Sequence, residues 1–282
     1  MQLTAYRPSI ELVALVAQLG GQWSGYRALC RCPAHADRSP SLSIRQGDRG
    51  VLVHCFAGCN PVDVLRALRR VSLSPVASAP DITDTDERAV ANVERIWREG
   101  RDVDGTLAKT YLKHRRIDTA FRDLRYHPRC PKGRKPETVF MPAMLVAVRD
   151  DARLTAIQRI FLEPNGHYTE KLMIGRPGAG AWRGSHPING KLAIAEGFET
   201  AARFTERTGI ACWAALGDAR LPMLALPTEL TELVIAEDSD PQGRLAAARA
   251  WRAHSRPGLT VKRMPPPATP GRPAPNDWAE VS

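Results

Sequence analysis

"KLAIAEGFETA" at residues 191–201 and "LVIAEDSDPQG" at residues 233–243 decide the fold class of this 282-residue chain. Each stretch is a short apolar run that ends abruptly in acidic residues. Runs this short, bounded by glycine and polar residues, are typical of buried parallel strands. Because open α/β sheets place their ligands at the carboxyl ends of such strands, the acids are predicted to lie at a functional edge.

Three carboxylates at this predicted edge are candidate metal ligands. Glu196 ends the first run, and Asp238 and Asp240 follow the second. The two aspartates are two residues apart, so in an extended chain their side chains point the same way. Converging carboxylates repel one another unless a cation lies between them, and an all-oxygen site suits Mg²⁺ or Mn²⁺. Such a site favours phosphoryl transfer. Taken alone, the aspartates could instead cap the helix that Pro241 begins.

A second group of candidate ligands lies in "CRCPAHADRSPSLSI" (30–44) and "VLVHCFAGCN" (51–60). The predicted ligands are Cys32, His35, Cys55 and Cys59. Two residues separate the first pair, three separate the second, and 19 lie between the pairs. This spacing is typical of a structural zinc site of the Cys₃His type, in which four ligands leave no position for a catalytic water. Cys32 is preferred because "CPAH" forms a tight knuckle, and whether Cys30 joins the site stays open.

Composition points to a nucleic-acid partner and to the cytoplasm. The net charge is +10 and the pI is about 9.7, which usually signals a polyanionic partner; a GC-rich genome that favours arginine is the alternative explanation. We find no apolar run of 18 residues and therefore expect no transmembrane helix. Six cysteines, four of them in a metal pattern, favour a reducing cytoplasm over a disulfide scaffold.

The pattern of elements predicts a multi-domain chain of α/β and α+β class. The predicted parts are a β zinc-ribbon DNA-binding domain at 1–71, a linker at 72–86, a basic α+β middle domain at 87–189 and a parallel-sheet catalytic domain at 190–282. In the middle part, we expect a loop at 125–138, three strands after it, and a flexible glycine-rich connection at 175–184. From residue 190 on, strands alternate with helices, which indicates a parallel sheet.

With these two constellations in this order, the chain resembles bacterial-type (DnaG-like) primases, in the form encoded by phages and mobile elements. "CPAHADRSPSLSI" and "VHCFAGC" resemble the primase zinc ribbon. The C-terminal half resembles a Toprim domain, the fold that topoisomerases share with these primases. The three residues between Cys55 and Cys59 are a departure, because replicative primases usually have two there. With no helicase segment after Asp277, we expect a stand-alone primase core.

The resemblance implies roles for the acidic residues. Glu196 matches the Toprim glutamate, which acts as an acid/base or a metal ligand. Asp238 and Asp240 match the Asp-x-Asp pair that binds metal. Asp277, in "PNDWAEV", resembles the late acidic position of the same site.

Two basic residues of the middle part are also assigned by resemblance. Arg159 lies in "LTAIQRIFL" and Lys171 lies in "TEKLMIG". Arg159 resembles the basic residue of a primase strand, and Lys171 resembles the basic residue before the Toprim domain. Both are expected to contact the triphosphate or the template phosphates. The zinc ribbon is expected to present further arginines to the template, namely Arg31, Arg38, Arg45 and Arg49.

The function that the resemblance implies is DNA primase activity: synthesis of short RNA primers on single-stranded DNA from NTPs, with structural Zn²⁺ and catalytic Mg²⁺ or Mn²⁺. A separately encoded replicative helicase is a possible partner, and no membrane is involved. Two alternatives stay open: a Toprim-type metal-dependent nuclease, and a non-catalytic accessory protein that binds single-stranded DNA. Toprim nucleases generally lack the zinc ribbon. Intact Glu196, Asp238 and Asp240 argue against a vestigial site.

Overall fold

The structure is a computed structural model that describes residues 8–24, 27–47, 50–71, 84–133, 136–268 and 274–281. Its contacts divide the chain into two compact units, a small one at residues 3–87 and a larger one that comprises residues 88–282. The predicted linker at 72–86 lies outside the described residues up to position 83, and helix α3 begins at Asp84. In the described part, no helix combines the length and the apolar character needed to cross a bilayer.

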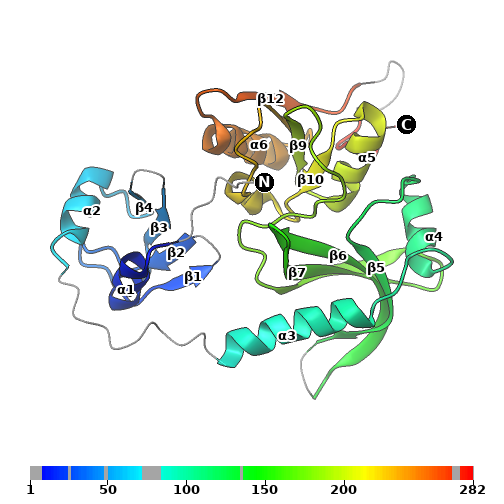
Figure 1. Cartoon of the computed structure of the whole chain (residues 1–282), viewed down its shortest axis with the longest axis horizontal. Coiled ribbons are helices and arrows are strands. Elements are labelled where there is room, and N and C mark those ends of the chain that lie inside the picture. Colours follow the sequence, from blue (N-terminus) through cyan, green and yellow to red (C-terminus); the bar gives the residue numbers. More distant parts are fainter. Residues whose placement is uncertain are drawn as a thin grey trace. The chain divides into compact units, whose positions relative to one another are not determined.

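The small unit is a four-stranded antiparallel sheet with two helices (Figure 1). Its elements are α1 (Ile10–Gln18), β1 (Gln22–Ser24), β2 (Arg27–Cys30), β3 (Leu42–Gln46), β4 (Val51–Cys55) and α2 (Pro61–Leu68). Each helix begins at a capping residue, since the side chains of Ser9 and Asn60 accept hydrogen bonds from the first turns of α1 and α2. Val16, Ile44 and Val64 are fully buried in the core between the sheet and the helices.

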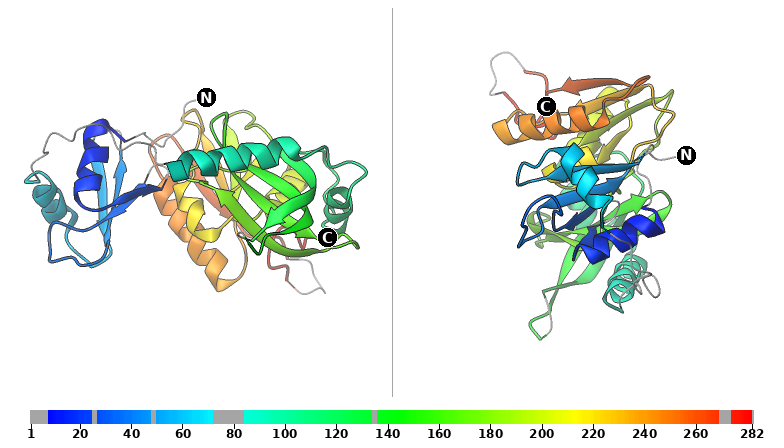
Figure 2. Two further views of the ribbon diagram at one scale, coloured as in Figure 1. Left: turned by 90° about the horizontal axis from the view of Figure 1, so that it is seen from below. Right: turned by 90° about the vertical axis from the view of Figure 1, so that its left-hand side faces the viewer.

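The middle part of the larger unit is a second antiparallel sheet, in the order β5-β6-β7-β8. Its strands are β5 (Leu124–Lys132), β6 (Val139–Asp150), β7 (Arg153–Leu162) and β8 (Tyr168–Gly175). Helix α3 (Asp84–Glu99) lies along one face of this sheet, where Ile96 packs with Leu145 (Figure 2). Helix α4 (Leu107–His114) packs against the other face through Tyr111 and Leu112.

Strand β5 corrects the prediction of a loop at 125–138. Its sequence contains Pro128 and Pro131, and proline has no N–H to donate to a sheet. The strand forms nevertheless, because it is an edge strand and its register with β6 shifts between His127 and Cys130. Pro128 lies in that irregularity, where no ladder hydrogen bond is lost.

The C-terminal part is a parallel sheet in the order β10-β9-β11-β12. Its elements are β9 (Lys191–Ala195), α5 (Phe198–Thr208), β10 (Cys212–Ala214), the 3₁₀ helix η1 (Asp218–Met223), β11 (Glu232–Ala236), α6 (Pro241–His254) and β12 (Thr260–Met264). The last residues of the strands are in register, Ala195 with Ala214 and Ala236, and Ala236 with Met264. The carboxyl ends of the strands therefore form one edge. The predicted α/β and α+β class, with an N-terminal β unit and a C-terminal parallel sheet, is confirmed.

The antiparallel and parallel sheets share one hydrophobic core, in which Met144 and Ile160 lie with Ala193 and Phe198. The division at residues 189 and 190 accordingly stays a prediction.

The glycine-rich connection at 175–184, which we expected to be flexible, is packed. Trp182 is fully buried, and its Nε1 donates a hydrogen bond to the carbonyl of Arg122 at 3.1 Å. The guanidinium of Arg220 donates to the carbonyls of Gly180 and Pro177, at 2.5 and 3.3 Å. Burial lowers the pKa of Arg220 to about 10, so its charge is kept at neutral pH.

Candidate functional site

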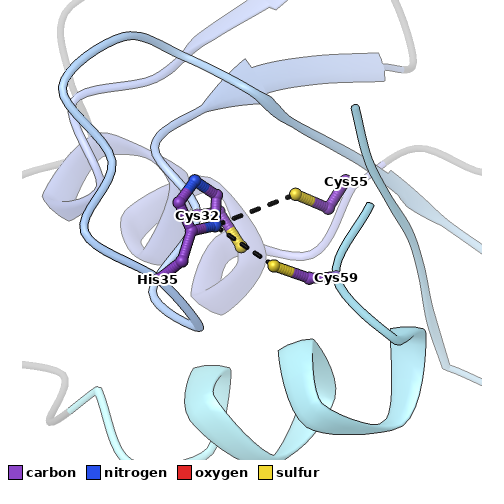
Figure 3. Close-up of side chains that lie close together, drawn as sticks. All are labelled: Cys32, His35, Cys55 and Cys59. Atoms are coloured by element: carbon purple, nitrogen blue, oxygen red, sulfur yellow. Dashed lines mark hydrogen bonds between the residues drawn. The ribbon is translucent and has the colours of Figure 1, made fainter. Parts of the chain in front are cut away.

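Four side chains of the small unit point toward one another (Figure 3). They are Cys32, His35, Cys55 and Cys59, and their ligand atoms all lie within 4.8 Å of one another. Nδ1 of His35 faces the thiols, 3.2 Å from Sγ of Cys59 and 4.0 Å from Sγ of Cys55. Three thiols and one imidazole form the soft ligand set that zinc prefers.

The local fold explains how this Cys/His group forms. Cys55 ends β4, and Cys59 lies one residue before Asn60, the cap of α2. Burial works against ionisation of Cys55, but hydrogen bonds from the backbone N–H groups of Cys59 and Ala57 lower its pKa to about 7. The turn between the two cysteines therefore favours the thiolate, the form that binds metal. Cys30 is fully buried and lies outside the group.

The predicted acids lie at the carboxyl edge of the parallel sheet. Glu196 directly follows β9, and Asp238 and Asp240 lie in the turn between β11 and α6. Within the described ranges, the Cys/His group is the only set of three or more ligand atoms that all lie within 4.8 Å of one another. The acids therefore lie along the edge, close enough for their charges to influence one another, but their oxygen atoms do not form a compact set of ligands.

Among these acids, Asp238 gives the clearest indication that the edge suits a cation. Burial, followed by the charges of Asp277 and Glu196, raises the pKa of Asp238 to about 7. Its Oδ1 is buried and has no hydrogen-bond partner. A buried carboxylate oxygen without a partner is costly, and a divalent cation with a preference for oxygen ligands would satisfy it. Gly243 permits this packing, because a Cβ there would lie 2.6 Å from the Cβ of Asp238.

Asp240 caps helix α6, as the alternative reading of the sequence allowed. Its Oδ1 accepts a hydrogen bond from the N–H of Gly243 at 2.8 Å, and its Oδ2 accepts one from Nδ2 of Asn276 at 3.2 Å. These two interactions lower the pKa of Asp240, so its carboxylate is ionised beside that of Asp238. The cap also fixes the geometry of the Asp-x-Asp turn.

Asp277 reaches the edge from the last described segment. Its neighbour Trp278 is buried, donates from Nε1 to the carbonyl of Met264 at 3.1 Å, and packs edge-on against Phe204. The carbonyl of Val281 accepts hydrogen bonds from the buried Arg203 and from Arg207. These contacts hold Asp277 in place, and burial raises its pKa.

Lys171 is held beside this edge by a buried carboxylate. Its Nζ lies 2.7 and 2.8 Å from the two oxygens of Glu199, in the first turn of α5, and the hydroxyl of Tyr111 donates to the same carboxylate. Burial works against ionisation of Glu199, but Lys171 and Tyr111 keep its pKa below the usual range. The charge of Glu199 in turn helps to raise the pKa of Asp277. The Lys171–Glu199 pair therefore adjoins the acids.

Arg159 lies elsewhere. Residues 157, 159 and 161 of β7 face helix α3, whereas Ile160, which pairs with Lys171, faces α4. Arg159 is 8% exposed, donates from Nη1 to the carbonyl of Pro131 at 2.5 Å, and lies over the ring of Phe161. This placement, on the opposite face of the sheet from Lys171, argues against the predicted phosphate contact.

Three further acids near the edge were missed in the sequence. Glu199 follows Glu196 by three residues. Asp218 raises the pKa of Glu196 and accepts from Nε2 of Gln242 at 2.7 Å. Glu237 is paired with Arg263 through two contacts of 2.7 Å. Asp218 follows strand β10 closely, so the rule that singled out acids after strands could have found it.

Family comparisons match two adjoining segments of the chain. Residues 191–282 match a family model described as a Toprim domain. Residues 87–186 match one described as a domain of unknown function (DUF7146). The search of curated proteins gives no match.

Among solved structures, the chain is similar to the DnaG catalytic core, with 15% identity and a TM-score of 0.51, over 68% of this chain and 74% of that chain. A second similar structure comprises the zinc-binding and RNA polymerase domains of the Aquifex aeolicus primase, with 15% identity and a TM-score of 0.45, over 96% of this chain and 81% of that chain. A third is a DNA primase domain from Pseudomonas aeruginosa, with 14% identity and a TM-score of 0.46, over 70% of this chain and 73% of that chain. The fold argument rests on the first, whose TM-score exceeds 0.5.

At these identities the likeness shows the fold. The oxygen donors at the carboxyl edge of the parallel sheet agree with the Toprim match. The chain therefore carries a C-terminal Toprim domain, in a fold similar to the DnaG catalytic core, together with an N-terminal Cys/His group whose donors suit a metal ion.

Proposed function

We propose that this protein is a DNA primase, which synthesises short RNA primers on single-stranded DNA by metal-dependent nucleotidyl transfer. The observation that carries the proposal is the unpaired, buried oxygen of Asp238, beside Glu196 and Asp277 at the carboxyl edge of the Toprim sheet. The similarity to primase cores supports a primase-like, nucleotidyltransferase type of activity.

The oxygens of Asp238, Asp240, Glu196 and Asp277 would hold Mg²⁺ or Mn²⁺. When bound, two such ions supply activation of the attacking 3′-hydroxyl and stabilisation of the leaving pyrophosphate. Burial, together with the charges of Asp218 and Asp240, raises the pKa of Glu196, and a divalent cation at this edge would offset the repulsion between these charges.

Lys171 supplies positive charge on the same side of the unit. Because Glu199 holds its ammonium through two contacts, the charge is oriented before substrate arrives. We assign Lys171 to the incoming phosphates and leave Arg159 out of the proposal.

The small unit is assigned to template binding, with Zn²⁺ in a structural role. Arg31, Arg38 and Arg45 are exposed, as a template surface requires, whereas Arg49 lies outside the described residues. Phe56 is 60% exposed, and the guanidinium of Arg27 lies over its ring at 5.7 Å. An exposed ring beside arginines is a common arrangement for binding single strands. A replicative helicase would serve as a partner that concentrates the enzyme on DNA.

The test is primer synthesis by the full chain on single-stranded DNA of mixed sequence, with labelled NTPs and Mg²⁺ or Mn²⁺. The Asp238→Asn variant removes the central charge. Asp104→Asn is a matched control. Asp104 lies in the loop before α4, its side chain is 74% exposed, and it pairs with Lys109. Short labelled oligonucleotides from the wild type and the control, but not from Asp238→Asn, would support the proposal. Metal-dependent DNA cleavage that Asp238→Asn abolishes would identify a nuclease. DNA binding without synthesis or cleavage would identify an accessory protein.

A further inference from the structure

An exposed aromatic residue begins strand β8 beside the Lys171–Glu199 pair. Tyr168 is 41% exposed. Along a regular strand, Tyr168 and Lys171 would point to opposite faces, since they are three residues apart. The register shifts here, however: Tyr168 pairs with Leu162, Glu170 with Phe161, and Lys171 with Ile160. The β-bulge at Thr169 thus turns Tyr168 to the face that carries Lys171, α4 and α5, as bulges beside active sites often do.

Cations and a second ring fix the orientation of Tyr168. The guanidinium of Arg115 lies 5.2 Å from the centre of its ring, and Nζ of Lys171 lies 5.0 Å from it. The ring of Tyr111 contacts it edge-on at 6.2 Å. An exposed ring that is held in this way loses little side-chain entropy when a flat ligand stacks on it.

A stacked pair of imidazoles lies between the same two elements. His114, the last residue of α4, and His167, in the loop before β8, have ring centres 4.7 Å apart and planes inclined by 24°, and both side chains are exposed. The loop approaches α4 closely at Gly166, where φ is +81° and a Cβ would lie 2.5 Å from Cγ2 of Thr110. Glycine at this position therefore allows the pair to form.

The location connects this aromatic cluster with the acids. Lys171 binds Glu199, and the charge of Glu199 is felt at Asp277. The cluster of Tyr168, Arg115, His114 and His167 thus begins one ion pair away from the carboxyl edge. An aromatic surface flanked by the cations of Arg115 and Lys171 suits a nucleotide, because it offers a ring to the base and positive charge to the phosphates.

We propose that Tyr168, Arg115 and the His114–His167 pair form a subsite on which an unpaired nucleobase stacks. The inference rests on the proposed primase function, and the base can come from the template strand or from an incoming NTP. Stacking of a base on an aromatic side chain contributes roughly 1–3 kcal/mol, which corresponds to a change in affinity of about 5- to 150-fold.

Three variants of the full chain test the subsite. Tyr168→Ala removes the ring, and Tyr168→Phe keeps it. Trp251→Ala is the control, since Trp251 is an aromatic residue of similar exposure (45%) on helix α6. Binding of a fluorescent oligothymidylate is measured by anisotropy without Mg²⁺ or NTPs, and binding of ATP is measured by calorimetry in the presence of Mg²⁺.

We expect Tyr168→Ala to weaken one of the two ligands about 5- to 150-fold, with Tyr168→Phe and Trp251→Ala within twofold of the wild type. The affected ligand identifies the source of the base. Unchanged binding of both ligands, or an equal loss in Tyr168→Phe, would overturn the proposal. If Tyr168→Ala fails to fold, as judged by its thermal transition, His167→Ala takes its place, with a loss expected for the same ligand. Oligonucleotide binding does not depend on catalysis. If the wild type makes no primers, but Tyr168→Ala still loses oligonucleotide binding, the proposed primase function is refuted and the proposed subsite is kept.

Discussion

The strongest prediction concerns the charge of Asp238. If burial and neighbouring carboxylates destabilise its ionised form, Asp238→Asn should stabilise the protein in the absence of divalent cations, although it should abolish primer synthesis. The variant keeps the shape of the side chain and removes the repulsion. In the wild type, Mg²⁺ should offset the same repulsion, whereas the variant should respond weakly to Mg²⁺.

The magnitude follows from the pKa. A rise from 3.8 to about 7 corresponds to about 4 kcal/mol at full effect. Because Asp238 is only partly buried, solvent screening reduces this to about 2 kcal/mol. In a unit of this size, 1 kcal/mol shifts the melting temperature by roughly 2–4 °C, so the expected gain is about 4–8 °C.

The pH dependence has a definite sign. Below about pH 4 Asp238 is protonated in both states, so the variant has no advantage. Between about pH 4 and 7 the folded wild type keeps a proton that the unfolded chain has released, so its stability falls as the pH rises. The advantage of the variant should therefore grow over this window and stay constant above it. Thermal unfolding of both proteins at pH 5, 6, 7 and 8, with and without Mg²⁺, measures this difference in stability. A variant that is less stable than the wild type at pH 8, or a gain in stability that does not depend on pH, would refute the reasoning.

Two other changes test the remaining interactions. If the Cys/His group holds zinc, Cys59→Ala should release it and unfold the small unit, because zinc binding in such sites supplies folding free energy. Metal analysis and the loss of the first thermal transition would show this, and a variant that retains one zinc per chain would exclude Cys59 as a ligand. Lys171→Met should destabilise the larger unit by about 3–5 kcal/mol, because Glu199 stays buried without its partner, and the deficit should shrink at low pH, where Glu199 takes up a proton. Denaturant unfolding of Lys171→Met beside the double variant with Glu199→Gln tests this, and equal deficits in both would contradict it.

Much of the parallel domain was predictable from sequence, because its signals are local. The runs around Ile194 and Ile235 are short, apolar and followed by acids, and the observed strands end at Ala195 and Ala236, directly before those acids. Pro241 marks the first turn of α6 in the sequence as in the structure. Likewise, the spacing of the cysteines and the histidine singled out the four side chains that the structure brings together.

The features that escaped prediction depend on contacts between distant segments. Strand β5 forms because its prolines occupy an edge and a bulge, and sequence alone does not show which strand will be an edge. Arg159 directly precedes Ile160, which lies on the face of the sheet that carries Lys171. Whether Arg159 reaches phosphates therefore depends on the strand register, which the sequence pattern did not determine. Glu199 became visible as the partner of Lys171 only when α5 was placed against β8.

The interior arginines change how the charge of +10 should be interpreted. Arg159, Arg203 and Arg220 direct their guanidinium groups to carbonyl oxygens of the protein itself. They count toward the isoelectric point but cannot displace ions condensed on a DNA strand. Counterion release depends on the cations that touch phosphates, with a slope in log K against log salt of about −0.7 per contact for single strands. The salt dependence of DNA binding should therefore reflect the outward-facing basic residues and be weaker than the net charge suggests.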